Sequence, residues 1–144
     1  MKQRTSAANP PASAAGKVAG VLFLVVAAFQ AALAVGAPWG EAAYGGGNPG
    51  VLPENLRGSS AIATVVYLFL AGVAGTRFSP PTLRRRLLLG ASGLMAVGAV
   101  MNLASPSLVE RLIWTPVTIV LVVALWRASR HESIANPKLL PATP

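Results

Sequence analysis

Residues 18–37 read VAGVLFLVVAAFQAALAVGA, a stretch in which Gln30 is the one strongly polar side chain. A helix of about 20 apolar residues crosses the roughly 30 Å hydrocarbon core of a bilayer. The helices of a soluble bundle keep a polar face, because their apolar positions recur with a period of about 3.6 residues. Residues 18–37 are apolar on every side, so we predict that they span a membrane.

Three further apolar stretches follow, at residues 59–76, 87–104 and 108–126. The mean hydropathy of the chain is +0.58. Only 11% of its residues are charged, whereas soluble domains carry about 25%. The sequence therefore predicts an all-α fold, a four-helix transmembrane bundle.

The stretches define one membrane domain over residues 17–127. Residues 1–16 are rich in Ala, Ser and Pro and are expected to form a disordered lead, and residues 128–144 a polar tail. The first stretch resembles a signal peptide, but it is longer than the usual apolar region, which favours an uncleaved anchor. Residues 38–58 form the longest loop, and their apolar side chains predict an ordered cap on the bundle.

Lys and Arg are distributed unequally between the two sides of this topology, in a chain of net charge +8. One side carries Lys2, Arg4, Lys17, Arg77, Arg84, Arg85, Arg86, Arg127, Arg130 and Lys138, and the other carries Arg57 and Arg111. Short loops rich in Lys and Arg stay in the cytoplasm. We therefore expect a protein of the cell membrane with both termini cytoplasmic. Its basic charge reflects membrane topology, and no nucleic-acid partner is expected.

Three consecutive cations, Arg84, Arg85 and Arg86, precede the third stretch. They are expected at the inner membrane surface, where each gains about 1 kcal/mol beside anionic lipid. Anchoring of the topology accounts for them, and binding of lipid headgroups is a second reading.

The few polar side chains within the stretches recur at helical spacing in the outer half of the bundle. They predict a polar stripe that the four helices turn toward one another. Two readings stay open: hydrogen bonds that hold helices together, and a small outward-facing pocket. The candidate pocket residues are Gln30, Trp39, Glu41, Thr64, Tyr67, Asn102, Arg111, Trp114 and Thr115.

Charged residues at the outer end offer further candidates. An ion pair between Arg111 and Glu41, Glu54 or Glu110 would lock the loop onto the bundle, or these groups would bind a headgroup or a small solute. Ser107 and Glu110 have the spacing of a capping box at the start of the fourth helix. Glu41 and Glu110 are also the only candidate carboxylate pair for acid–base chemistry.

The sequence offers no other catalytic or metal-binding motif. It contains no cysteine and one histidine, so thiolate nucleophiles and cysteine-based metal sites are excluded. No metal and no cofactor is expected. Gly16 and Gly20 have the GxxxG spacing that favours close packing of membrane helices.

Several short motifs occur together in the outer loop and the last turn: GAPWG at 36–40, GG at 45–46, NLAS at 102–105 and ER at 110–111, followed by Trp114 and Pro116. In this combination the chain resembles small four-helix membrane proteins of bacteria, of the actinobacterial and bacillar type. The resemblance implies the topology described above, and no activity or catalytic residue comes with it.

The leading hypothesis is a non-enzymatic membrane protein that binds a lipid or small apolar ligand in the outer half of the bundle, or a membrane partner. The alternative is a subunit of a small oligomeric transporter or channel, since four short helices rarely enclose a pathway alone. A membrane enzyme ranks third.

Overall fold

Four long helices make up the computed structural model, which describes residues 12–135. They are α1 (Ala14–Ala34), α2 (Glu54–Gly75), α3 (Pro81–Leu103) and α4 (Leu108–Ala135), and two short 3₁₀ turns, η1 (Gly40–Ala42) and η2 (Tyr44–Gly46), lie between α1 and α2. All four helices are long and apolar enough to cross a membrane. The described part of the chain contains no strand. The prediction of an all-α, four-helix membrane fold is therefore confirmed.

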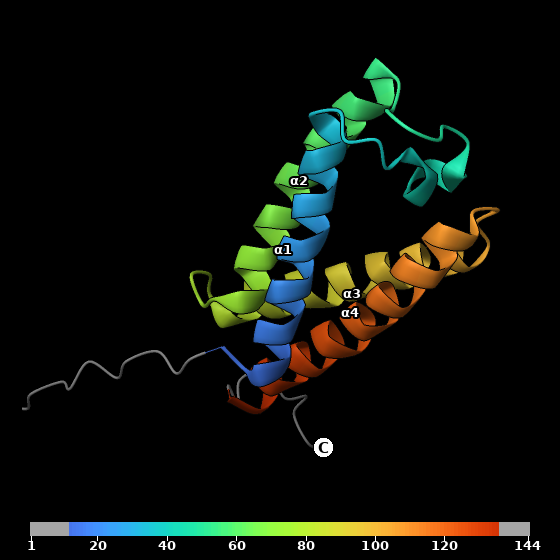
Figure 1. Cartoon of the computed structure of the whole chain (residues 1–144). Helices are drawn as coiled ribbons and strands as arrows, with labels where there is room; N and C mark the ends of the chain where they lie inside the picture. The colour runs from blue at the N-terminus through green and yellow to red at the C-terminus, as the bar shows by residue number, and fades with distance from the viewer. Residues whose placement is uncertain (1–11, 136–144) are drawn as a thin grey trace, which may run out of the picture.

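The helices form two antiparallel hairpins, α1–α2 and α3–α4 (Figure 1). The hairpins meet through α1 and α4, whereas α2 and α3 contact each other little. They lie closest where α1 begins and α4 ends, which we call the terminal end, and they diverge toward the opposite end (Figure 1). We call that opposite end the loop end, because the segment with η1 and η2 bridges the two hairpins there.

Small residues let α1 and α2 approach closely. A Cβ atom built on Gly16 would lie 2.6 Å from the Ala74 carbonyl oxygen, and one on Gly20 would lie 3.0 Å from the Cα atom of Gly75. Any larger side chain at either position would push the helices apart. The GxxxG spacing therefore marks a real helix contact.

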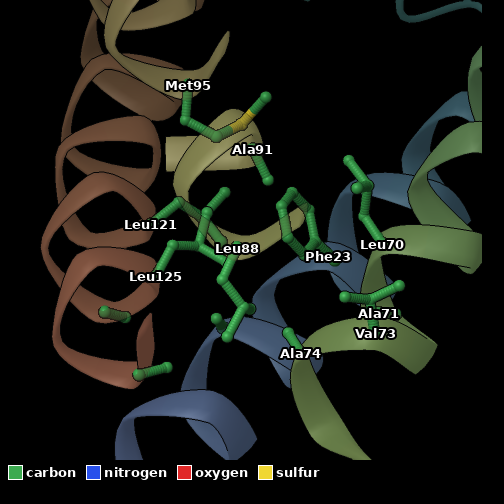
Figure 2. Packing of buried hydrophobic residues seen from close by; sticks show 13 residues of the cluster. Phe23, Leu70, Ala71, Val73, Ala74, Leu88, Ala91, Met95, Leu121 and Leu125 are labelled. Carbon is green, nitrogen blue, oxygen red and sulfur yellow. The ribbon is translucent and has the colours of Figure 1, made fainter. Parts of the chain in front are cut away.

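The main core lies between the hairpins, on the side of the terminal end. Phe23, Leu88, Leu121 and Leu125 have no exposed surface there, and alanines of α1, α2 and α3 fill the space around them (Figure 2). A smaller cluster at the loop end packs Leu33 of α1 against the loop. This second cluster seats the loop on the first hairpin.

Helix bounds differ from the predicted spans wherever a helix continues past its apolar stretch. α1 begins at Ala14, because the Ser13 side chain accepts a hydrogen bond from the Gly16 N–H and caps the helix. The last three residues of the predicted lead are thus helical, and residues 1–11 lie outside the described part. α2 begins at Glu54, within the predicted loop 38–58, and its acidic side chain suits a helix N-terminus.

The third and fourth helices extend furthest beyond their predicted spans. α3 begins at Pro81, a residue type favoured in the first turn of a helix. α4 continues to Ala135, so the start of the predicted tail is helical rather than frayed. Its last turns are held by burial of Ala128 and Glu132. Residues 136–144 lie outside the described part of the chain.

Candidate functional site

A cavity of about 240 Å³ lies between the hairpins at the loop end. All four helices and the loop contribute to its wall. Its lining residues are Val26, Phe29, Gln30, Ala42, Ala43, Tyr44, Tyr67, Met95, Asn102, Glu110, Trp114, Thr118 and Leu121. Apolar and aromatic side chains with a few polar groups are the usual lining of a small-molecule site.

The loop closes the cavity through hydrogen bonds to the second hairpin. The Trp114 indole N–H donates to the Ala42 carbonyl oxygen at 2.8 Å. The Ser107 hydroxyl donates to the Glu41 backbone carbonyl oxygen at 2.6 Å. The Gly45 N–H donates to the Glu110 carboxylate at 3.0 Å. α4 and the turn before it thus hold the loop at three successive points.

Tyr44 ties the same loop to the first hairpin. Its hydroxyl lies 3.0 Å from the Ser60 hydroxyl and donates to the Leu56 carbonyl oxygen at 3.3 Å, both on α2. The Tyr44 backbone has φ +53°, in the left-handed region that non-glycine residues rarely adopt. Such a conformation costs of order 1–3 kcal/mol and persists only where its surroundings hold it. The hydrogen bonds on both sides of the loop supply that restraint.

One polar atom inside the site has no partner. The Gln30 Oε1 atom is buried, and none of the described residues donates a hydrogen bond to it. Leaving a buried acceptor unpaired costs about 1–3 kcal/mol. A ligand that donates a hydrogen bond here would recover this free energy.

Aromatic rings form one wall of the cavity. The Phe29 ring lies 4.6 Å from the Trp114 ring, tilted by 57°. On its far side Phe29 stacks on Trp39, with ring centroids 6.1 Å apart. The contacts between the rings hold Phe29 and Trp114 in place beside the cavity that they line.

Four of the nine predicted pocket residues line this cavity: Gln30, Tyr67, Asn102 and Trp114. The other five lie elsewhere, and each has an identifiable environment. Trp39 stacks behind the wall, and the Thr64 hydroxyl bonds the Ser60 carbonyl oxygen of its own helix. Glu41 and Arg111 are exposed. The Thr115 hydroxyl is buried without a partner among the described residues, yet it does not line the cavity.

The polar lining residues that the predicted set omits are Tyr44, Glu110 and Thr118. The sequence predicts Glu110 as a charged residue at the outer end, and in the structure its carboxylate accepts hydrogen bonds from the Gly45 N–H and the Ser105 hydroxyl beside the cavity. Tyr44 reaches the cavity only through the fold of a glycine-rich loop. The spacing of Glu110 from Trp114 and Thr118, four and eight residues away on one helix face, was the available signal.

The predicted lock between Arg111 and a carboxylate does not form. Among the described residues the ion pairs are those of Arg77 and Arg84 with Glu132, at the other end of the bundle. Arg57 contributes instead by donating from Nε to the Ala34 carbonyl oxygen at 3.0 Å, which ties α2 to the end of α1.

Only one of the two hydrogen bonds of the predicted capping box forms. The Glu110 N–H donates to the Ser107 hydroxyl at 3.1 Å, as expected. In a complete capping box the Ser107 N–H would donate to the Glu110 carboxylate. Here it donates to the Ser105 hydroxyl instead. The carboxylate is thereby free to hold the loop.

At the terminal end, Arg84 is buried, with 1% of its surface exposed. Its guanidinium donates to the Glu132 carboxylate and to three carbonyl oxygens at the end of α2, those of Val73, Ala74 and Thr76. A cation suits this position, because the C-terminal end of a helix carries partial negative charge. Arg84 therefore joins α2, α3 and α4 and does not reach a lipid headgroup.

The predicted headgroup role remains a prediction for Arg85 and Arg86. Arg86 is exposed, whereas Arg85 is half-buried and interacts within the protein. Arg77 adds a second hydrogen bond to Glu132 at 2.9 Å. The three consecutive arginines thus have three different environments.

No family model, curated protein or solved structure matches this chain. Within residues 12–135, no cluster of three or more His, Asp or Glu side chains is placed to hold a metal ion. The function proposed below therefore depends on the geometry of the cavity.

Proposed function

We propose that this protein binds a small amphipathic molecule in the cavity between its two hairpins. The observation that carries the proposal is the buried, unpaired Oε1 atom of Gln30, a residue that lines a largely apolar and aromatic cavity. A ligand with an apolar body and a hydrogen-bond donor would satisfy that acceptor and cover the aromatic wall. The proposal assigns no chemical step to the site.

The size of the cavity limits the ligand. A cavity of about 150 Å³ accommodates benzene, and this one measures about 240 Å³. A ring with a short side chain, or the end of one alkyl chain, matches this volume. A complete two-chain lipid does not, so a lipid would enter with one part of its structure only.

Binding is favoured over transport within a single chain. Below the cavity, Leu121 is fully buried between the lining and the main core, and the core continues through Leu125 to the Arg84–Glu132 pair. A solute in the cavity therefore meets packed side chains on its way to the terminal end. Transport would require an oligomer or a large movement of the hairpins.

The first test uses the fluorescence of Trp114, which lines the cavity. In a Trp39→Phe/Trp126→Phe background in nanodiscs, 2-phenylethanol is expected to change this fluorescence in a saturable way. Gln30→Leu should weaken binding by about 5–10-fold, since it removes the acceptor. Thr64→Val is the matched control, because that hydroxyl bonds its own helix outside the cavity, and it should change the affinity less than about twofold. Absence of saturation, or equal effects of the two substitutions, would contradict the proposal.

We further propose that the protein lies in the cell membrane with its terminal end in the cytoplasm. The support is the distribution of charge: Lys17, Arg77, Arg86, Arg127 and Arg130 belong to the terminal end, whereas Arg57 and Arg111 belong to the loop end. Cytoplasmic loops carry the excess of Lys and Arg.

Cysteine labelling tests this orientation, because the native chain contains no cysteine. Gly47→Cys places a thiol in the loop, where a Cβ atom meets nothing within 4 Å, and His131→Cys places one on an exposed position of α4. In intact cells a membrane-impermeant maleimide is expected to label the first variant and not the second. Permeabilised cells provide the control, in which both should react. The reverse pattern would place the terminal end outside.

A further inference from the structure

The charge of the cavity narrows the class of ligand. Glu110 is the only lining residue with a formal charge, and no Lys or Arg lines the cavity. Its Oε2 atom accepts the hydrogen bonds from the Gly45 N–H and the Ser105 hydroxyl. These bonds leave the second carboxylate oxygen, Oε1, to accept from a ligand. A carboxylate away from water gains most from a cation close by.

Three of the donors in the lining are used within the protein, those of Trp114, Thr118 and Tyr44. Trp114 donates its indole N–H to the Ala42 carbonyl oxygen. The Thr118 hydroxyl donates to carbonyl oxygens of its own helix, and the Tyr44 hydroxyl is held by α2. The buried Oε1 of Gln30 remains an unpaired acceptor. Beside the amides of Gln30 and Asn102 and the Tyr67 hydroxyl, the lining therefore offers two acceptors to N–H or O–H groups of a ligand, the Glu110 carboxylate and the Gln30 Oε1 atom.

The aromatic wall also favours a positively charged ligand. Phe29 and Trp114 lie with their ring centroids 4.6 Å apart, and Tyr67 lies across the cavity on α2. Ring faces attract cations, because their π electrons carry negative partial charge. Carboxylate, carbonyl acceptor and ring faces together are the groups that recognise an ammonium.

We infer that the cavity selects a protonated amine carried on a small apolar body. Glu110 is the charge partner, Gln30 Oε1 accepts an N–H, and Phe29 and Trp114 cover the apolar part. The inference rests on the proposed function and adds the charge of the ligand to it. A free amine and the ammonium headgroup of an aminophospholipid share this chemistry, and the test separates them.

The test compares 2-phenylethylamine with 2-phenylethanol, which have the same apolar body and differ in charge. With Trp114 fluorescence as the readout, we expect the amine to bind at least about tenfold more tightly, as charge-assisted hydrogen bonds are about twice as strong as neutral ones. Glu110→Gln should abolish this preference, because it should weaken binding of the amine much more than binding of the alcohol. Gln keeps the shape of the side chain and an acceptor for Gly45 and Ser105. Glu54→Gln, at an exposed carboxylate outside the cavity, should leave the preference intact.

The outcomes distinguish this inference from the proposed function. Binding of neither compound overturns the ligand site itself. Equal binding of both supports the site and overturns its selectivity for a cation. Loss of both ligands in Glu110→Gln also overturns the inference, because Glu110 would then act only by holding the loop. Phosphatidylethanolamine and phosphatidylcholine have the same net charge, but only the first headgroup carries N–H donors. If phosphatidylethanolamine nanodiscs weaken amine binding relative to phosphatidylcholine nanodiscs, the headgroup is a source of the ammonium, and equal affinities indicate a free amine.

Discussion

Replacement of Glu132 by Leu is expected to lower the free energy of unfolding by about 3–5 kcal/mol, the usual cost of removing one partner of a buried ion pair. Glu132 is 1% exposed, and its carboxylate accepts from both Arg84 and Arg77. Without it two guanidinium groups lose their counter-charge at the point where α2, α3 and α4 meet. The effect is large because the Arg84 side chain is itself buried and cannot turn to water.

Denaturant titration in detergent, followed by circular dichroism, measures this effect. Arg86→Gln is the control, because Arg86 is exposed, and its effect should stay within about 0.5 kcal/mol. Arg84→Leu combined with Glu132→Leu should cost less than the sum of the two single substitutions, since it removes both charges of the pair. A loss below about 1 kcal/mol for Glu132→Leu would show that the pair does not hold the helices together.

Replacement of Gly40 by Ala is expected to release the loop while leaving the helices folded. A Cβ atom at this position would lie 2.0 Å from the Asn48 carbonyl oxygen and 2.9 Å from that of Gly50. The backbone must move to avoid this overlap, and the hydrogen bond from the Gly40 N–H to the Gly50 carbonyl oxygen, 2.9 Å long, would then be lost. An overpacked site typically costs about 1–3 kcal/mol.

Limited proteolysis reports the release. Chymotrypsin cleavage after Tyr44 should become about tenfold faster in Gly40→Ala, because cleavage follows the population of the opened loop. Gly47→Ala is the matched control in the same loop: its φ of −68° suits alanine, and a Cβ atom there meets nothing within 4 Å. Its cleavage rate should equal that of the native protein. Equal rates for all three proteins would mean that Gly40 does not determine the loop structure.

The helices were predictable because one property decides them. A bilayer requires long, continuous apolar stretches, and hydropathy reports such stretches directly. The residues at which the helices begin and end were less predictable, since they depend on local groups outside the apolar stretch. Ser13 caps α1 five residues before its apolar stretch starts at residue 18. α4 continues past Trp126 because Glu132 forms hydrogen bonds within the bundle.

The predictions for Arg84 considered membrane topology and lipid headgroups, and they did not include the buried ion pair with Glu132. Helical spacing nevertheless carried a signal for both partners. Arg84 lies on the face of Leu88, Ala91 and Met95, all of them buried. Glu132 follows Leu121, Leu125 and Ala128 at the same spacing. A charge in register with a buried face predicts a buried partner.

The cavity was predictable only as far as helix periodicity reaches. Gln30, Tyr67 and Asn102 were placed by their spacing on a helix face, and they line the cavity. The part of the lining that the loop contributes depends on the path of the loop, where Tyr44 and Gly45 adopt positive φ angles. Nothing in the pattern of apolar residues encodes that path.

The position of Glu132 in the chain also determines when its ion pairs can form during synthesis. Arg84 precedes Glu132 by 48 residues and Arg77 precedes it by 55. During synthesis both arginines therefore emerge, together with α2 and α3, well before the carboxylate that pairs with them. The first hairpin can insert early, but the junction of the two hairpins closes only once α4 is complete. A chain truncated before Glu132 would leave Arg77 and Arg84 without the carboxylate that both of them bind.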